Sequence, residues 1–131
     1  MELDFISDQY SLYHLEHFFC YLVDDVPLSN DGKHQIRLCF YEAVTNAVKH
    51  GNQYDATKKV YIRREWGADR LVFFIRDEGA GFDYQIVANR CCTENLDSES
   101  GRGIFLLKNY AQVIDYSEET KTLRLEFKWP I

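Results

Sequence analysis

Hydrophobic residues recur at helical spacing in two stretches of the N-terminal half. From about Asp8 to Asp24, the apolar positions are Leu12, Leu15, Phe18, Phe19, Leu22 and Val23, a spacing that places them on one side of a helix. Ser29 or Asn30 can cap a second helix that runs to about His50, where Gly51 stops it. The pattern therefore predicts two helices before residue 52.

Shorter apolar runs, bounded by turn residues, predict strands in the rest of the chain. The expected strands are residues 1–6, 58–65, 70–77, 113–116 and 123–128, with polar turns at 67–69 and 117–121. A short helix around 84–90, a polar loop over 93–100 and a helix over 103–111 are expected between the two hairpins. Early helices and mostly antiparallel strands predict an α+β fold, a two-layer sandwich whose mixed sheet is covered on one face. No repeat or linker divides the chain, so residues 1–131 are expected to form a single domain.

The charge of the chain is unevenly distributed. Its 131 residues carry 15 Lys+Arg and 21 Asp+Glu, a net charge of −6, which argues against a nucleic-acid partner bound through its phosphates. Residues 1–32 contain seven acids and no Lys or Arg, so a basic signal or transit peptide is excluded. No apolar run approaches the ~20 residues of a membrane span. We expect a cytoplasmic protein, with the acidic segment offered to a protein partner.

The four cysteines have no metal-ligand spacing. Cys20 and Cys39 lie among apolar neighbours and are expected in the core. The adjacent Cys91 and Cys92 are either ordinary core or loop thiols or a redox pair.

Three segments carry groups suited to chemistry. In the second helix, Glu42, Asn46 and His50 are spaced four apart and form a polar stripe. Glu42 is a carboxylate able to accept a proton, and Asn46 offers an amide oxygen of the kind that ligates Mg²⁺ already held by phosphates. A solvated stripe on an amphipathic helix is the alternative interpretation.

The second segment follows an apolar strand and contains Asp77, Gly79 and Gly81. A carboxylate at a strand end can accept a hydrogen bond from an exocyclic amine such as that of adenine, and the glycines allow close backbone approach. A tight turn would use the same residues.

The third segment opens a helix with Gly101, Arg102 and Gly103. Backbone amides at a helix start can hold an anion, and an arginine adds charge to the same site. A loop entering a core helix is the alternative. Neither a Walker loop nor a Rossmann fingerprint is present.

Together, and in this order, the three segments resemble the N, G1 and G2 boxes of the ATPase fold shared by histidine kinases, gyrase-type ATPases and Hsp90-like chaperones. The phrases EAVTNAVKHGN, DEGAGF and GRGIFLLKNYA resemble most closely the small anti-sigma-factor serine-protein kinases of bacteria. The resemblance implies a protein that binds ATP and Mg²⁺ and phosphorylates a serine of an anti-anti-sigma protein of the STAS type. In its other state such a protein sequesters a sigma factor.

The resemblance also implies roles for individual residues. Asn46 would ligate Mg²⁺, and Glu42 would act as the base toward the serine hydroxyl. His50 belongs to the matching N box and is counted with the ATP-binding residues, although no definite role follows. Residues 90–100 would form a lid over the nucleotide. The residues that line the phosphates would be Gly101, Arg102 and Gly103.

The adenine pocket is implied in the same way. Asp77 would accept a hydrogen bond from the adenine amine, and Gly79 and Gly81 would shape the pocket around it. The family commonly has Gly-Thr at the start of its last strand, where the threonine supports the adenine-binding acid. This chain has Thr120 and Thr122 and no glycine there, and Thr122 is the position we assign.

Two other functions use the same residues. The first is a catalytically silent module that binds its partner in a nucleotide-dependent way. The second is a histidine-kinase fragment, which needs a phospho-accepting histidine, whereas His14 and His17 lack the usual His-Glu pairing and are expected on the helix surface. Aromatic residues of the first helix, Tyr10, Tyr13, Phe18, Phe19 and Tyr21, form either a homodimer face or part of the core.

Overall fold

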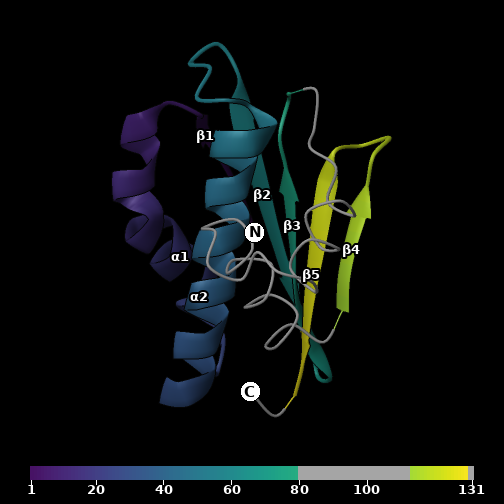
Figure 1. Ribbon diagram of the computed structural model, residues 1–131. Helices are drawn as coiled ribbons and strands as arrows, with labels where there is room; N and C mark the ends of the chain where they lie inside the picture. The colour runs from purple at the N-terminus through teal and green to yellow at the C-terminus, as the bar shows by residue number, and fades with distance from the viewer. Residues whose placement is uncertain (80–112, 130–131) are drawn as a thin grey trace, which may run out of the picture.

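Five strands form one sheet, and the helices cover one of its faces in the computed structural model, which describes residues 1–79 and 113–129 (Figure 1). The strands are β1 (Glu2–Ile6), β2 (Lys59–Trp66), β3 (Arg70–Arg76), β4 (Val113–Ser117) and β5 (Thr122–Lys128). Their order across the sheet is β1-β2-β3-β5-β4, and every pairing among these strands is antiparallel. The predicted two-layer α+β fold is confirmed, but the sheet formed by the described residues is purely antiparallel rather than mixed.

The expected strands match the observed ones to within one or two residues, including the short edge strand at the N-terminus. The helices expected over 84–90 and 103–111 and the polar loop over 93–100 lie outside the described residues, as do Cys91 and Cys92.

The first predicted helix is divided into two parts. A 3₁₀-helix η1 (Gln9–His14) precedes the α-helix α1 (Leu15–Val23). The Asp8 carboxylate accepts a hydrogen bond from the Ser11 backbone N–H at 3.0 Å, and the Ser11 hydroxyl donates to the Asp8 carbonyl at 2.6 Å. These short-range bonds favour the tighter 3₁₀ turn at the entry to the helix. The prediction of one continuous α-helix from Asp8 is therefore wrong.

The second predicted helix is confirmed as α2 (Asn30–Asn46), with the Ser29 hydroxyl accepting from the Gly32 backbone N–H at 3.0 Å. The helix continues through a π-helical turn, η2 (Ala47–Gly51). The Asn52 backbone N–H donates to the Ala47 carbonyl at 2.9 Å, five residues earlier. Such π turns are rare and frequently occur at functional sites.

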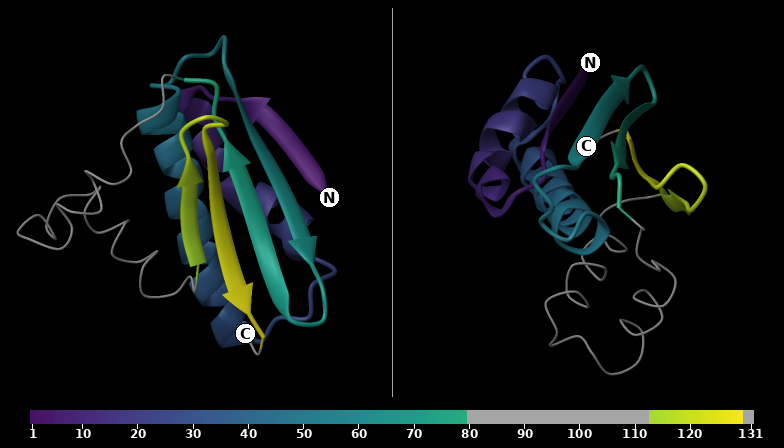
Figure 2. Two further views of the ribbon diagram at one scale, coloured as in Figure 1. Left: turned by 90° about the vertical axis from the view of Figure 1, so that its right-hand side faces the viewer. Right: turned by 90° about the horizontal axis from the view of Figure 1, so that it is seen from above.

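The core lies between the helices and one face of the sheet (Figure 2). Phe40 of α2 is at its centre, with ring centroids 5.4 Å from Phe19 of α1 and 5.6 Å from Phe73 of β3. The fully buried strand residues that face the helices include Val60, Ile62, Leu71, Phe73 and Leu125. The alternation along each strand leaves its other side chains on the opposite, uncovered face.

The two described cysteines differ in environment. Cys39 is fully buried, as predicted, and burial raises the pKa of its thiol to about 12. Cys20 is exposed, with its thiol 3.4 Å from a Glu16 carboxylate oxygen. The prediction that Cys20 lies in the core is therefore wrong, because this position of α1 is exposed to solvent.

Several acids of residues 1–32 pair with bases elsewhere in the chain. Asp25 lies 3.3 Å from Arg64, Glu16 lies 3.1 Å from Arg37, and Asp4 lies 3.4 Å from Lys59. The aromatic residues of the first helical segment are divided: Phe19 is in the core, whereas Tyr10, Tyr13 and Tyr21 are exposed. His14 and His17 are exposed, as expected. Among the described residues, no helix is long and apolar enough to cross a membrane.

Candidate functional site

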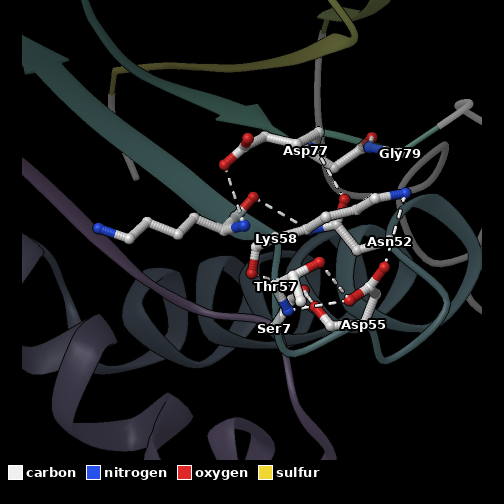
Figure 3. A network of polar contacts seen from close by, with 9 residues as sticks. Ser7, Asn52, Asp55, Thr57, Lys58, Asp77 and Gly79 are labelled. Atoms are coloured by element: carbon white, nitrogen blue, oxygen red, sulfur yellow. Dashed lines mark hydrogen bonds and ion pairs between the residues drawn. The ribbon is translucent and has the colours of Figure 1, made fainter.

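The end of the long helix meets the end of β3, although the two lie far apart in the chain (Figure 3). A methyl group added at Gly79 would lie 1.7 Å from the backbone carbonyl oxygen of Gly51. One added at Gly51 would lie 2.3 Å from a carboxylate oxygen of Asp77. Only glycine at both positions permits this approach, which brings the predicted helix and strand-end segments together.

Asp77 provides a buried carboxylate at this junction. Its side chain is 3% exposed and accepts a hydrogen bond from the Gly79 backbone N–H at 2.9 Å. Burial raises the pKa of Asp77, an effect opposed by the Gly79 hydrogen bond and by the charges of Lys121, Lys58 and Arg76. A carboxylate removed from water in this way is a strong acceptor for a ligand's N–H donor.

A hollow of about 500 Å³ lies beside Asp77. Glu119, Thr120 and Lys121, from the turn between β4 and β5, line it together with Asp77. The Asp77 backbone N–H donates to the Lys121 carbonyl at 3.3 Å, which joins this turn to the end of β3. The hollow is open to solvent and has Asp77 among its lining residues.

Thr122 is placed differently from the sequence expectation. It lies opposite Arg76 in the register of β3 and β5, and its hydroxyl donates to the Thr120 carbonyl at 3.1 Å. Because its neighbour Leu123 faces the core, Thr122 faces the uncovered side of the sheet, away from the helices. The structure therefore brings Thr120, and not the Thr122 hydroxyl, to the hollow that Asp77 lines.

Asn52 joins the same junction and is absent from the residues that the sequence singled out as site residues. It is 1% exposed, and its amide oxygen accepts from the Glu78 backbone N–H at 2.8 Å. Its amide nitrogen donates to the Lys59 carbonyl at 3.0 Å. Its position directly after the HG pair of the N-box segment was the signal available in the sequence.

Ser7 forms a separate polar contact with the loop of residues 52–58, which joins the helix end to β2 (Figure 3). It is fully buried, and its hydroxyl is within hydrogen-bonding distance of the Asp55 carbonyl, at 2.8 Å, and the Lys58 carbonyl, at 3.1 Å. This contact fixes the loop to the N-terminal segment without touching Asp77 or Gly79.

The polar stripe of the long helix is only partly solvated. Asn46 is 5% exposed, whereas Glu42 and His50 are of intermediate burial. The π turn begins directly after Asn46, so His50 is not placed by the regular α-helical spacing that relates Glu42 to Asn46. Within the ranges that the structure describes, the Asn46 amide makes no side-chain hydrogen bond, which leaves its oxygen available to a ligand.

No group of three or more His, Cys, Asp or Glu side chains that could hold a metal ion is found among residues 1–79 and 113–129. Asn46 offers a neutral amide oxygen, which would serve as an added donor to a divalent cation held by a ligand's phosphates. This donor set fits Mg²⁺, which keeps few protein ligands beside substrate phosphates. Of the other predicted site residues, Gly81, Gly101, Arg102 and Gly103 lie outside the described residues.

Comparison with known proteins identifies a matching family and several relatives. Residues 7–127 match the model of the histidine kinase-like ATPase domain. The anti-sigma F factor of Shouchella clausii is 34% identical over 87 residues, which cover 65% of this chain and 60% of that protein. The serine-protein kinase RsbW of Staphylococcus epidermidis is 30% identical over 105 residues, covering 74% of this chain and 66% of the relative. The chain thus spans less than two thirds of the length of these curated relatives.

Proposed function

The chain belongs to the histidine kinase-like ATPase family, and from this premise we propose that it is an ATP-dependent serine-protein kinase and anti-sigma factor. Its proposed substrate is a serine of an anti-anti-sigma protein of the STAS type, and its proposed second partner is a sigma factor. The observation that carries the proposal is the junction of Gly51, Asp77 and Gly79, which presents a buried carboxylate beside a hollow. The names of the relatives support the choice of a kinase over other ATPases of this family.

In the proposed complex, the Asp77 carboxylate accepts a hydrogen bond from the exocyclic amine of adenine. The burial of this carboxylate strengthens the bond, because little water competes for it. Gly79 and Gly81 form the adjacent wall of the pocket. The proposed phosphate contacts are Gly101, Arg102 and Gly103.

The helix provides the groups proposed for phosphoryl transfer. Asn46 would hold Mg²⁺ through its amide oxygen, and the metal, when bound, neutralises phosphate charge. Glu42 lies one helical turn before Asn46 and accepts the proton of the incoming serine hydroxyl. His50, the third residue of the predicted polar stripe, stays in the proposed ATP site. A transfer that rests on positioning and charge neutralisation needs few other protein groups.

We place this activity in the cytoplasm, where sigma factors act, and a homodimer is a further proposed assembly. The exposed Tyr10, Tyr13 and Tyr21 offer an aromatic surface for such a contact.

Replacing Glu42 by glutamine should slow phosphate transfer while leaving ATP binding unchanged. The amide keeps the shape of the side chain but cannot accept the serine proton, and loss of a positioned base typically costs roughly 10²–10⁴-fold in rate. The measurement is transfer of labelled phosphate from ATP to serine of a STAS-type protein encoded near this gene, beside the ATP dissociation constant.

Glu65→Gln is the control, because Glu65 is an exposed acid of β2. Equal transfer rates for Glu42→Gln and the parent would contradict the role of Glu42. Tight ATP binding by the parent without transfer to any STAS-type protein would favour the silent binding module instead.

Neutralising exposed acids of the first 32 residues should weaken partner binding and leave ATP affinity unchanged. Suitable acids are Glu2, Asp24 and Asp31, which are all exposed and distant in sequence from the junction. The measurement compares the triple amide variant with the parent in titrations with ATP and in pull-down of the sigma factor or STAS-type protein. A loss of ATP affinity would contradict the proposed separation of the two surfaces.

A further inference from the structure

Resting on the proposed ATP site, we infer that Asn52 is a positioning residue that determines how strictly the site selects adenine. In this proposal Asn52 does not bind the base itself. It acts through the loop of residues 77–79, which carries the Asp77 carboxylate, by tying that loop to the helix end and to β2.

Asn52 connects three parts of the fold through one side chain and its backbone. Its backbone N–H donates to Ala47 at the start of the π turn, at 2.9 Å. Its amide oxygen accepts from the backbone of Glu78, at 2.8 Å, and its amide nitrogen donates to the backbone of Lys59, at 3.0 Å. Because both side-chain bonds are to backbone groups, they place the chain itself rather than another side chain.

Glu78 provides a second attachment for the same loop. One oxygen of its carboxylate accepts from the Lys59 backbone N–H and from the Tyr61 hydroxyl, both at 3.0 Å. The residue between Asp77 and Gly79 is thus held by Asn52 through its backbone and by β2 through its side chain. At the N-terminal end of this loop, the Asp77 backbone N–H donates to the Lys121 carbonyl at 3.3 Å.

The position of the carboxylate matters because hydrogen bonds to an amine are effective only over a few tenths of an ångström in distance. Removing the Asn52 amide, which is almost fully buried, would take away the partner of the partly buried Glu78 N–H and Lys59 carbonyl. The loop would then move to regain hydrogen bonds, and the Asp77 carboxylate would move with it. We expect the bond to the amine to be affected more than the contacts to the triphosphate, because Asn52 holds the loop that carries Asp77.

The experiment measures selectivity for the exocyclic amine rather than stability. Dissociation constants of ATP and of purine riboside triphosphate, which lacks that amine, are determined for the parent, Asn52→Ala and Ser7→Ala. We expect the parent to prefer ATP by about tenfold or more, the value of one hydrogen bond to a charged group. In Asn52→Ala this ratio should fall at least about threefold, toward one.

Ser7→Ala is the matched control, because Ser7 is equally buried, bonds the backbone of Asp55 and Lys58 in the segment that follows Asn52, and does not contact residues 77–79. It should lower the melting temperature while keeping the parental ratio. If Asn52→Ala does not fold, Glu78→Ala serves in its place, since it removes the second attachment and should lower the ratio in the same direction.

The outcomes separate this inference from the proposed function. A parent that binds both triphosphates equally contradicts the adenine role of Asp77 and with it the proposed ATP site. A parent that prefers ATP, with an unchanged ratio in the folded Asn52→Ala or Glu78→Ala variant, overturns the positioning role alone. An equal fall of the ratio in Ser7→Ala also overturns it, because a general loss of stability near the site would then be sufficient to lower the selectivity for adenine.

Discussion

Replacing Gly79 by alanine should abolish ATP binding and destabilise the fold. The added methyl group would lie 1.7 Å from the Gly51 carbonyl oxygen and 3.1 Å from the Asn52 backbone nitrogen. Both neighbours are backbone atoms, so no side-chain rotation relieves the overlap, and the loop or the helix end must shift. Overpacking of this kind typically costs about 1–3 kcal/mol. The shift would also displace the Asp77 carboxylate, which accepts from the Gly79 N–H.

Thermal unfolding and an ATP titration measure the two effects. Gly67→Ala is the matched control, since a methyl group at Gly67, in the turn between β2 and β3, would meet no atom within 4 Å. We expect that control to melt and to bind ATP like the parent. Parental ATP affinity in Gly79→Ala would show that the close contact between the two glycines is unnecessary for the site.

Replacing Asp77 by asparagine should separate ATP binding from stability. The neutral amide is a weaker acceptor than a carboxylate, and hydrogen bonds to charged groups contribute about 1.5–3 kcal/mol, so ATP affinity should fall roughly tenfold or more. The shape of the side chain is kept, and the amide oxygen can still accept from the Gly79 N–H. The protein should therefore stay folded at neutral pH without its ligand.

The direction of the stability change follows from the raised pKa of Asp77. Its main cause is burial, so the folded state disfavours the ionised form. Between the ordinary value of 3.8 and the raised value, the folded protein binds more protons than the unfolded chain. This carboxyl group therefore makes stability fall as pH rises through that window, and the lower stability persists above it.

The free energy of unfolding, measured from pH 3 to pH 8 in the parent and in Asp77→Asn, tests this sign. The difference between the two proteins should grow in favour of Asp77→Asn as pH rises, because the variant has no carboxyl group to ionise. Asp115→Asn, which makes the same change at an exposed acid of β4, is the control. A parent that gains stability relative to Asp77→Asn on ionisation would contradict the desolvation of Asp77.

Local patterns were sufficient for most elements of the fold. Ser29, one of the two predicted caps, is the N-cap of α2, because a cap depends on the hydroxyl and on an N–H three residues away. The two hairpins follow in the same way from alternation and turn residues. The predicted start of the first helix was wrong, because Asp8 and Ser11 form equally local hydrogen bonds that favour a 3₁₀ turn.

Environment was harder to predict than secondary structure. Cys20 and Cys39 have similar apolar neighbours in the sequence, yet only Cys39 is buried. Thr120 and Thr122 were both candidates beside Asp77, and only the register of β5 against β3 places Thr122 on the uncovered face. Such outcomes depend on which side of an element meets its neighbour.

Residue types and short spacings in the sequence were sufficient to predict the order of the elements and the capping of α2, and they provided the candidate groups for binding a nucleotide. These features depend on residue types and on spacings of a few positions, which the chain states directly. The tertiary structure was needed to show that Gly51 meets Gly79 and that Asp77 is buried. It was also needed to show that Asn52 bonds the backbone of Glu78, between Asp77 and Gly79. Those facts arise where α2 packs across the end of β3, so contacts between distant residues, rather than any local pattern, create the site.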